Sequence, residues 1–468
     1  MIVGEQIKVV DITDKPVTIN PNSQSGKIYV RSVLGPIETI RRYIGFVFLG
    51  IFALLPWVKY QGHQAILLDF AAQRFHLFGL TLWPQDLMIF AWIFIIGAFA
   101  LFFATVVLGR VWCGFTCPQT VFTFLFVWIE ERIEGTRNKR IHLDKQDISL
   151  NKAGKKITKH GLWWLVSLLT SLTFVGYFTP VDKLFVEFLS LDISALSFGF
   201  VLFFAACTYA NAGWMRELMC THICPYSRFQ SSMFDNDTLT VTYDRARGEG
   251  RGPRPRKMSQ LEYNQKGLGD CIDCQLCVQV CPTGIDIRNG LQYECINCGK
   301  CIDACNDVMT KMGYRHNLIS YTSQTEIAGK KSKLIRPKVI GYFVVLMVIL
   351  SAMVIDISTR KPLDIDLIRD RASLYKETID GDLENVYTLV IRNKSQKQQS
   401  FHIDIEGLAV KEIIGKRQVS VAGSELVSYP ISIIVDPSSL SSSVTQFNIS
   451  VSNDDSDTVT EQITFLSY

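Results

Sequence analysis

The stretch GDCIDCQLCVQVCPTGIDIRNGLQYECINCGKCIDAC, residues 269–305, contains eight cysteines in two runs of identical spacing. The two runs are Cys271, Cys274, Cys277 and Cys281, then Cys295, Cys298, Cys301 and Cys305. Gaps of two residues allow three thiolates of one tight loop to bind three irons of a single cube, and the helical turn that follows carries the fourth thiolate away. The stretch therefore predicts ligands for two 4Fe–4S clusters.

The spacing also predicts how the thiolates are shared, because in two-cluster bacterial ferredoxins the fourth cysteine of each run binds the other cluster. The predicted ligands of cluster one are Cys271, Cys274, Cys277 and Cys305. The predicted ligands of cluster two are Cys281, Cys295, Cys298 and Cys301. Asn306 stands where Pro282 follows the first run, which alters a loop without removing a ligand. Eight cysteines in two copies disfavour a zinc ribbon, and the clusters imply one-electron transfer rather than bond cleavage.

Outside this stretch the chain is more apolar than an ordinary soluble protein. It has 468 residues, of which 48% are hydrophobic, and a mean hydropathy of +0.18. Five uncharged apolar stretches predict a transmembrane bundle of five helices: Tyr43–Val58, Leu87–Gly109, Gly161–Val181, Ile193–Met215 and Val339–Ile355. About 20 residues cross a hydrocarbon core of about 30 Å, and the first and last stretches are slightly shorter than that. The N-terminus shows no cleavable signal.

Basic residues predict the orientation, because loops rich in lysine and arginine stay in the cytoplasm. They crowd residues 110–159, between the second and third predicted spans, whereas the loops on the other side carry few. We therefore expect a cytoplasmic N-terminus and an external C-terminus. All 13 cysteines lie between Cys113 and Cys305, on the side expected to be reducing, which favours metal or redox use over disulfides. The basic run at 245–257 predicts contact with anionic membrane lipid rather than nucleic acid.

Two further cysteine pairs share a CxxxCP pattern, in RVWCGFTCPQT (110–120) and MCTHICPYS (219–227). Each follows a pair of predicted spans, so the membrane region resembles two duplicated hairpins that bring Cys113, Cys117, Cys220 and Cys224 together at its cytoplasmic end. The prolines place each pair at a helix end or turn. Four soft thiolates favour Cu(I) and can first accept Cu(II), but a third iron–sulfur cluster or a reversible dithiol is also compatible with the pattern. His222 is a possible additional ligand, and Cys207 is interpreted as a packing residue.

The order of these features predicts a multi-domain membrane protein. Its parts are an N-terminal cytoplasmic tail (1–38), a four-helix membrane region with the CxxxCP pairs (39–215), a cytoplasmic α+β dicluster ferredoxin-like domain (216–337), a fifth membrane helix (338–357) and a periplasmic all-β domain (358–468). Short alternating stretches such as NVYTLVIRN (385–393) and TQFNISVSN (445–453) indicate that the last domain is an immunoglobulin-like sandwich. No haem-attachment motif, no histidine within the predicted spans and no persuasive nucleotide fingerprint is present, so electrons must come from a separate donor.

The CxxxCP pairs, the cluster run, the terminal sandwich and the stretches at 128–145 and 233–254 together resemble the CcoG family, also called FixG or RdxA. The resemblance implies a multi-pass protein of the bacterial inner membrane. It implies reduction of Cu(II) to Cu(I) in the cytoplasm during assembly of the C-family haem–copper cytochrome c oxidase, with Cys113, Cys117, Cys220 and Cys224 handling copper as substrate or transient ligand. The expected partners are an unknown cytoplasmic electron donor, a copper exporter or chaperones and oxidase assembly factors, and a homodimer is possible.

Two other classes of function stay open at this point. A NapH-type membrane ferredoxin resembles the hairpins and clusters and would oxidise quinol to feed a periplasmic reductase, but it is not expected to end in a long sandwich domain. A non-enzymatic scaffold for oxidase assembly would use the sandwich for binding and the clusters for structure or sensing. Cu(II) reduction by purified protein with intact clusters separates a reductase from a scaffold.

Overall fold

The computed structural model describes residues 27–255, 258, 260–370, 374–395, 397–440, 442–453 and 457–467. Most of the predicted tail at 1–38 lies outside the described residues. The chain forms two compact units, one of which contains the chain through Leu54 together with Ile96–Val175 and Leu184–Met347. The other contains Leu55–Ile95, Gly176–Lys183 and the chain from Val348 onward.

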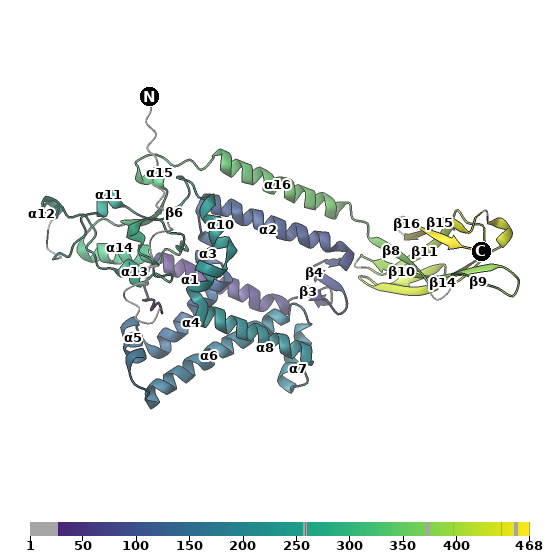
Figure 1. The fold of residues 1–468 in the computed structure, drawn as a ribbon, viewed down its shortest axis with the longest axis horizontal. Coiled ribbons are helices and arrows are strands. Elements are labelled where there is room, and N and C mark those ends of the chain that lie inside the picture. The colour runs from purple at the N-terminus through teal and green to yellow at the C-terminus, as the bar shows by residue number, and fades with distance from the viewer. Residues whose placement is uncertain are drawn as a thin grey trace, which may run out of the picture. The chain divides into compact units, whose positions relative to one another are not determined.

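Long apolar helices dominate the membrane region (Figure 1). They are α1 (Pro36–Leu54), α2 (Leu87–Leu108), α4 (Pro118–Glu134), α6 (Leu150–Val175), α8 (Ala195–Tyr209) and α16 (Pro337–Ser358). Shorter helices connect them: α3 (Val111–Phe115), α5 (Arg137–Lys145), α7 (Val181–Ser190), α9 (Arg216–Leu218) and α10 (Pro225–Met233). Helices α6 and α8 pack side by side as a hairpin, and the Ser171 hydroxyl donates to the Val201 carbonyl oxygen at 2.6 Å.

Five helical segments are long and apolar enough to cross a membrane by length and composition: Pro36–Trp57, Leu87–Leu108, Val111–Glu134, Ala195–Ile223 and Pro337–Ser358. Four of them overlap the predicted spans, but the predicted span Gly161–Val181 is not among them, and Val111–Glu134 was not expected. Helix α6 contains four lysines in its first ten residues and ends at Val175, so its uncharged part is shorter than predicted. The chain is thus a multi-pass membrane protein with five candidate spans, among which Val111–Glu134 stands in place of the predicted Gly161–Val181.

Helix α4 is held at both ends by segments that reach the cluster domain. Near its start, a Cβ atom added to Gly114 would lie 2.8 Å from the carbonyl oxygen of Ile296. Near its end, Glu130 pairs with Arg140, whose guanidinium also donates to the Val30 carbonyl oxygen. Next to Val30, the backbone N–H of Arg31 donates to the Gln279 carbonyl oxygen at 2.8 Å, so the segments beside both ends of α4 contact the cluster domain.

The cluster domain has the expected α+β character. Strand β6 (Thr240–Tyr243) pairs antiparallel with β7 (Ile319–Thr322), and the two strands come from opposite ends of the domain. Its helices are α11 (Arg245–Gly248), α12 (Gln260–Gln265), α13 (Leu276–Gln279), α14 (Lys300–Met312) and α15 (Gln324–Ile327). A small core that includes Val241, Met309 and Leu318 lies against the cluster cysteines, so the bound clusters must contribute to stability here.

The second unit contains two β structures. Between α1 and α2 the chain forms β1 (Lys59–Tyr60), β2 (His63–Gln64), β3 (Ile66–Asp69), β4 (Arg74–Leu77) and β5 (Leu80–Leu82). The C-terminal strands are β8 (Leu363–Arg369), β9 (Lys376–Glu377), β10 (Leu383–Asn393), β11 (Gln399–Glu406), β12 (Val410–Ile414), β13 (Gln418–Val421), β14 (Leu426–Val435), β15 (Val444–Asn453) and β16 (Thr458–Leu466).

These C-terminal strands form two antiparallel sheets, which confirms the predicted sandwich. One sheet has the order β12–β14–β10–β8, with β9 also paired to β10, and the other has the order β13–β11–β15–β16. Alternate residues of both sheets point inward, as in β15, and their core includes Tyr387, Phe401, Phe447 and Phe465, all 2% exposed or less. The expected fold class is therefore confirmed: a helical membrane region, an α+β cluster domain and an immunoglobulin-like sandwich.

Candidate functional site

The two cysteine runs share one backbone conformation. In each CxxCxxC loop the residue before the second cysteine and the residue after it have positive φ: Asp273 (52°) and Gln275 (55°), then Asn297 (53°) and Gly299 (71°). Left-handed residues at matching places turn both loops in the same way, so that three thiols of each loop face a common centre. At Gly299 an added Cβ would also lie 2.7 Å from the Ile37 side chain, so this position requires glycine.

Two cavities lie inside these loops, and their walls group the cysteines. Cys271, Cys274, Cys277 and Cys305 line one cavity. Cys281, Cys295, Cys298 and Cys301 line the other, together with Cys277. These are the two ligand sets that the spacing predicts.

The chemistry of the donors fits 4Fe–4S clusters. Burial raises the pKa of Cys277, Cys295 and Cys305 to about 12, so these thiols keep their protons at neutral pH unless a metal replaces them. Backbone N–H groups donate to several of the sulfurs, for example that of Leu276 to Cys274. Such bonds stabilise thiolate ligands and tune the potential of a bound cluster.

The second cysteine of each CxxxCP segment has the same local geometry, whereas the first lies in the α-helix α3 in one segment and in a π-helical turn in the other. Cys117 is the residue before α4, and its φ and ψ are −57° and 126°. Cys224 is the residue before α10, with φ −70° and ψ 113°. Each is followed by the proline that begins its helix, where the missing N–H costs no hydrogen bond. The internal duplication therefore extends to the backbone of the second cysteine in each pair.

The structure brings the four thiols of the CxxxCP segments together. Cys113 lies within electrostatic reach of Cys117, Cys220 and Cys224, and its Sγ lies 3.7 Å from Oε1 of Gln230. In the described part of the chain, no three His, Cys, Asp or Glu side chains are close enough to form a ready-made site for one metal ion.

The structure also places the possible ligand His222, the packing residue Cys207 and two further histidines. The exposed His222 forms a hydrogen bond of 2.7 Å through Nδ1 with the hydroxyl of Thr221. Cys207 is part of α8. His63 and His76 stack on each other in the second unit, with ring centroids 4.9 Å apart.

Arg110 links the paired thiols to cluster two. Its side chain is 2% exposed, and its guanidinium donates to the carbonyl oxygens of Tyr293 and Ser227 and, at 3.4 Å, to that of Cys295. Tyr293 and Cys295 belong to the second cluster loop, whereas Ser227 belongs to α10. One buried cation therefore fixes the first CxxxCP segment, the helix after the second segment and a cluster ligand to one another.

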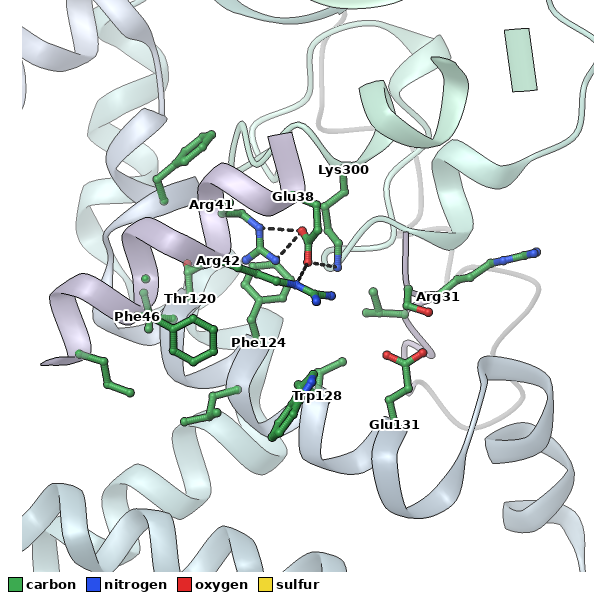
Figure 2. A pocket seen from close by; sticks show the side chains of 18 residues that line it. Arg31, Glu38, Arg41, Arg42, Phe46, Thr120, Phe124, Trp128, Glu131 and Lys300 are labelled. Atoms are coloured by element: carbon green, nitrogen blue, oxygen red, sulfur yellow. Dashed lines mark hydrogen bonds and ion pairs between the residues drawn. The ribbon is translucent and has the colours of Figure 1, made fainter. Parts of the chain in front are cut away.

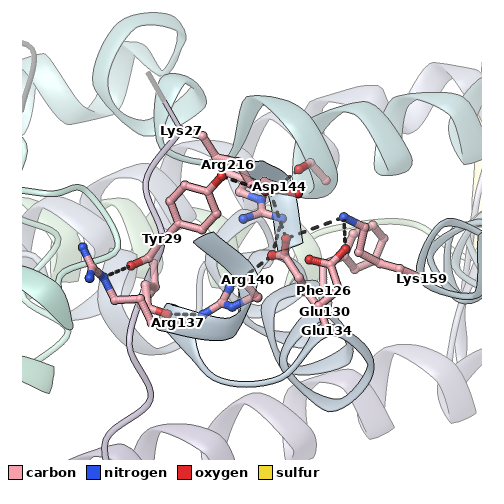
Figure 3. A network of polar contacts seen from close by, with 12 residues as sticks. Lys27, Tyr29, Phe126, Glu130, Glu134, Arg137, Arg140, Asp144, Lys159 and Arg216 are labelled. Carbon is pink, nitrogen blue, oxygen red and sulfur yellow. Dashed lines mark hydrogen bonds and ion pairs between the residues drawn. The ribbon is translucent and has the colours of Figure 1, made fainter. Parts of the chain in front are cut away.

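A buried network of charged side chains supports the same region (Figure 3). Glu130, which is fully buried, lies within 4 Å of four cations: Lys27, Arg140, Lys159 and Arg216. Arg216 pairs with Glu130 at 2.9 Å, and Gln119, two residues after Cys117, donates to the Arg216 carbonyl oxygen at 3.3 Å. The network thus ties α4 to the segment before the second pair of cysteines.

Sequence reasoning missed Arg110, Gln119 and this network. The spacing of Glu130 and Glu134, four residues apart and therefore on one face of the helix, is the signal that could have found the network. Arg110 carries no such signal, because it is one of many basic residues in its loop and only the fold shows what it contacts.

Comparisons with known protein families match three parts of the chain. Residues 215–324 match a family model described as "4Fe-4S dicluster domain". Residues 353–468 match "IG-like fold at C-terminal of FixG, putative oxidoreductase". Residues 90–136, which include Cys113 and Cys117, match "4Fe-4S binding domain". Iron–sulfur chemistry is therefore matched in the membrane region as well as in the cluster domain.

Several curated proteins are similar over long stretches. The nitrogen fixation protein FixG of Rhizobium meliloti is 33% identical over 82% of this chain and 79% of its own length. Protein RdxA of Cereibacter sphaeroides is 36% identical over 86% of each chain. The ferredoxin-type protein NapH of Haemophilus influenzae is 24% identical over 47% of this chain and 68% of its own length. The similarity to FixG and RdxA thus covers most of the chain, and that to NapH about half.

Proposed function

The chain belongs to the FixG and RdxA family of membrane-associated 4Fe–4S electron-transfer proteins, and on this premise we propose that it reduces Cu(II) to Cu(I) for the assembly of a C-family haem–copper cytochrome c oxidase. One observation carries the proposal: four thiols from two CxxxCP segments gather beside the loop that would hold cluster two, joined to it by Arg110. Copper is the substrate, and the four thiols are its proposed binding site.

The chemistry needs one electron for each copper ion. When bound, the two 4Fe–4S clusters supply one-electron carriers held by the eight ferredoxin cysteines. Each Cu²⁺ takes up one electron and becomes Cu⁺, and no proton or covalent bond is transferred. Soft thiolates bind Cu⁺ preferentially, so the paired cysteines favour the reduced product. Because Arg110 lies close to both Cys113 and Cys220, its positive charge balances thiolate charge at the site.

We place the N-terminus and cluster domain in the cytoplasm of a bacterial inner membrane, and the sandwich in the periplasm. In this proposal, reduced copper passes to an exporter or chaperone, and the sandwich binds oxidase assembly factors. Anionic lipid contacts the basic segments. A homodimer is compatible with this arrangement. A NapH-like protein would not be expected to end in a sandwich domain. The sandwich therefore favours a role in oxidase assembly over a NapH-like role.

A second candidate for the paired thiols is a third 4Fe–4S cluster. The "4Fe-4S binding domain" match over residues 90–136 includes Cys113 and Cys117. Iron analysis separates the two candidates, because a third cluster predicts about 12 iron atoms per chain instead of about 8.

The test is a single turnover without oxygen. Full-length protein with intact clusters is reduced, freed of excess reductant and mixed with Cu(II), and Cu(I) formation is followed together with cluster oxidation. We expect up to two Cu(I) per chain, since two clusters store two electrons. Replacing Cys113, Cys117, Cys220 and Cys224 by alanine is expected to abolish the rapid phase, whereas Cys207→Ala is the matched control. No Cu(I) from the intact protein would favour a scaffold, and an unchanged rapid phase in the fourfold variant would refute the role of the pairs.

A further inference from the structure

A further cavity, separate from the two that the cluster cysteines line, lies between α1, α3, α4 and the start of α14 (Figure 2). Aromatic side chains form much of its wall: Phe46, Phe115, Phe124 and Trp128. Its other end is charged, with Glu38, Arg41, Arg42 and Lys300. A flat apolar ring with polar substituents at its edge matches this division between aromatic and charged walls.

The cavity shares a wall with the site of cluster two. Lys300 lines both this cavity and the cavity formed by the second set of cysteines. In the chain it stands between Cys298 and Cys301, two predicted ligands of that cluster. A molecule held in the cavity would therefore be a direct neighbour of an electron carrier.

The charged end is already organised around Glu38. Its carboxylate accepts two hydrogen bonds from Arg41, at 2.6 and 2.9 Å, and one from Arg42 at 2.8 Å. Arg41 also lies over the Phe124 ring at 3.5 Å from its centroid. These contacts hold Arg41 in place and leave it little freedom to move onto a new anion.

One polar group in the wall lacks a partner. Thr120 is 4% exposed, it lines the cavity, and its hydroxyl has no hydrogen-bond partner among the described residues. A buried hydroxyl without a partner costs free energy, so a ligand oxygen within the cavity would remove that cost. The hydroxyl can donate to a carbonyl oxygen or accept from a ring hydroxyl.

From these observations we propose that the cavity binds a lipid-soluble quinol, which serves as the electron donor to the clusters. The quinol loses two electrons and two protons and becomes a quinone, and the electrons leave singly, one for each cluster. Glu131 receives the protons one at a time and releases each before it takes the next, because it lines this cavity and also an adjoining surface groove that reaches Asp307. The donor is then in the membrane, and no soluble cytoplasmic donor is needed for this route.

A phospholipid headgroup is the competing occupant, because the charged end is basic. The Thr120 hydroxyl can serve either occupant, whereas the aromatic walls and the shared wall with cluster two favour a redox-active ring, since a headgroup uses neither of them. The two occupants differ in one measurable respect: a quinol reduces the clusters, and a phospholipid does not.

The experiment measures cluster reduction by decylubiquinol in full-length, cluster-loaded protein without oxygen, followed by electron paramagnetic resonance. Gly45 of α1 lines the cavity, and a Cβ added there meets only Val121, at 3.6 Å. Gly45→Leu therefore fills the cavity without straining the backbone. Gly50→Leu in the same helix is the matched control, because a Cβ at Gly50 has nothing within 4 Å.

We expect decylubiquinol to reduce the wild-type protein and Gly50→Leu at equal rates, and Gly45→Leu at least tenfold more slowly, whereas dithionite reduces all three fully. Thr120→Val is a second variant in case Gly45→Leu does not fold. It is expected to raise the half-saturating quinol concentration by about tenfold. Thr170→Val is its control, since that hydroxyl bonds within its own helix.

Three results would overturn the proposal. The first is no reduction of wild-type clusters by quinol when dithionite reduces them. The second is equal quinol rates in Gly45→Leu and Gly50→Leu. The third is loss of co-purified phospholipid from Gly45→Leu with an unchanged quinol rate, which would assign the cavity to a headgroup. Copper is absent from the assay, so the outcome is independent of the proposed copper reduction.

Discussion

Arg110→Met tests whether one buried cation holds the paired thiols against cluster two. The substitution keeps an unbranched apolar stem and removes the donors to Ser227 and Tyr293 and the longer contact to Cys295. A buried carbonyl oxygen left without its donor costs about 1–3 kcal/mol. The Ser227 contact is buried and that to Tyr293 only partly so, so we expect a loss of about 2–4 kcal/mol. In a domain of 150–250 residues, 1 kcal/mol changes Tm by about 2–4 °C, which predicts a fall of at least about 4 °C.

The assay combines thermal unfolding with the single turnover of Cu(II). All eight cluster cysteines are intact in Arg110→Met, so the iron content is expected to be unchanged, whereas oxidation of the clusters by Cu(II) is expected to slow at least tenfold. Lys145→Met removes an exposed cation from α5 and serves as the control. If Arg110→Met matches this control in both Tm and copper rate, Arg110 does not join the two sites and the reasoning fails.

The remaining predictions concern the clusters and the charged network. Gly299→Ala is expected to prevent assembly of cluster two and so to halve the iron per chain, because its Cβ would clash with the Ile37 side chain. Gly313, the control position, has a similar φ of 74° with open space around it. Gly313→Ala is therefore expected to lower the stability of the fold by only about 1–2 kcal/mol. If both variants retain full iron, the loop geometry is not essential. Glu130→Gln is expected to destabilise the fold by about 3–5 kcal/mol, as seen when a buried ion pair loses one partner, and chemical denaturation measures this loss. Lys156 is partly exposed, so Lys156→Met is expected to destabilise the fold less. Equal losses would contradict the central place of Glu130 in the charged network. The pKa of Cys277 is raised to about 12, so this thiol must release a proton to bind iron. Iron uptake by the cluster-free protein is therefore expected to fall as the pH is lowered from about 8 to about 6. Iron uptake that does not depend on pH would contradict this.

The grouping of the eight cluster cysteines around two cavities was predictable, because it depends on spacing along the chain. Two-residue gaps determine which thiols of a loop face each other, and the cavities group Cys281 with the second run and Cys305 with the first, as the spacing predicts. The sandwich was equally accessible, since alternation with a period of two is visible in strands such as β10 and β15.

The membrane region was predicted less well, because hydropathy does not show where a helix begins or ends. The predicted span at 161–181 ran past Val175, where the helix stops before the turn that leads to Pro180. Helix α4 was not recognised from the sequence as a helix distinct from the basic loop at 110–159. The ion pairs of its buried acids Glu130 and Glu134 with lysines and arginines further along the chain are visible only in the fold. Partners such as Arg216 are 86 residues from Glu130, and no local pattern connects them.

The most direct test of the central claim is X-ray absorption at the copper edge after a single turnover of the reduced, full-length protein. The account predicts Cu(I) bound by sulfur in the wild type and in Cys207→Ala. It predicts loss of those sulfur ligands when Cys113, Cys117, Cys220 and Cys224 are replaced by alanine. Cu(I) without sulfur ligands in the wild type, or the same sulfur ligands in the fourfold variant, would contradict it.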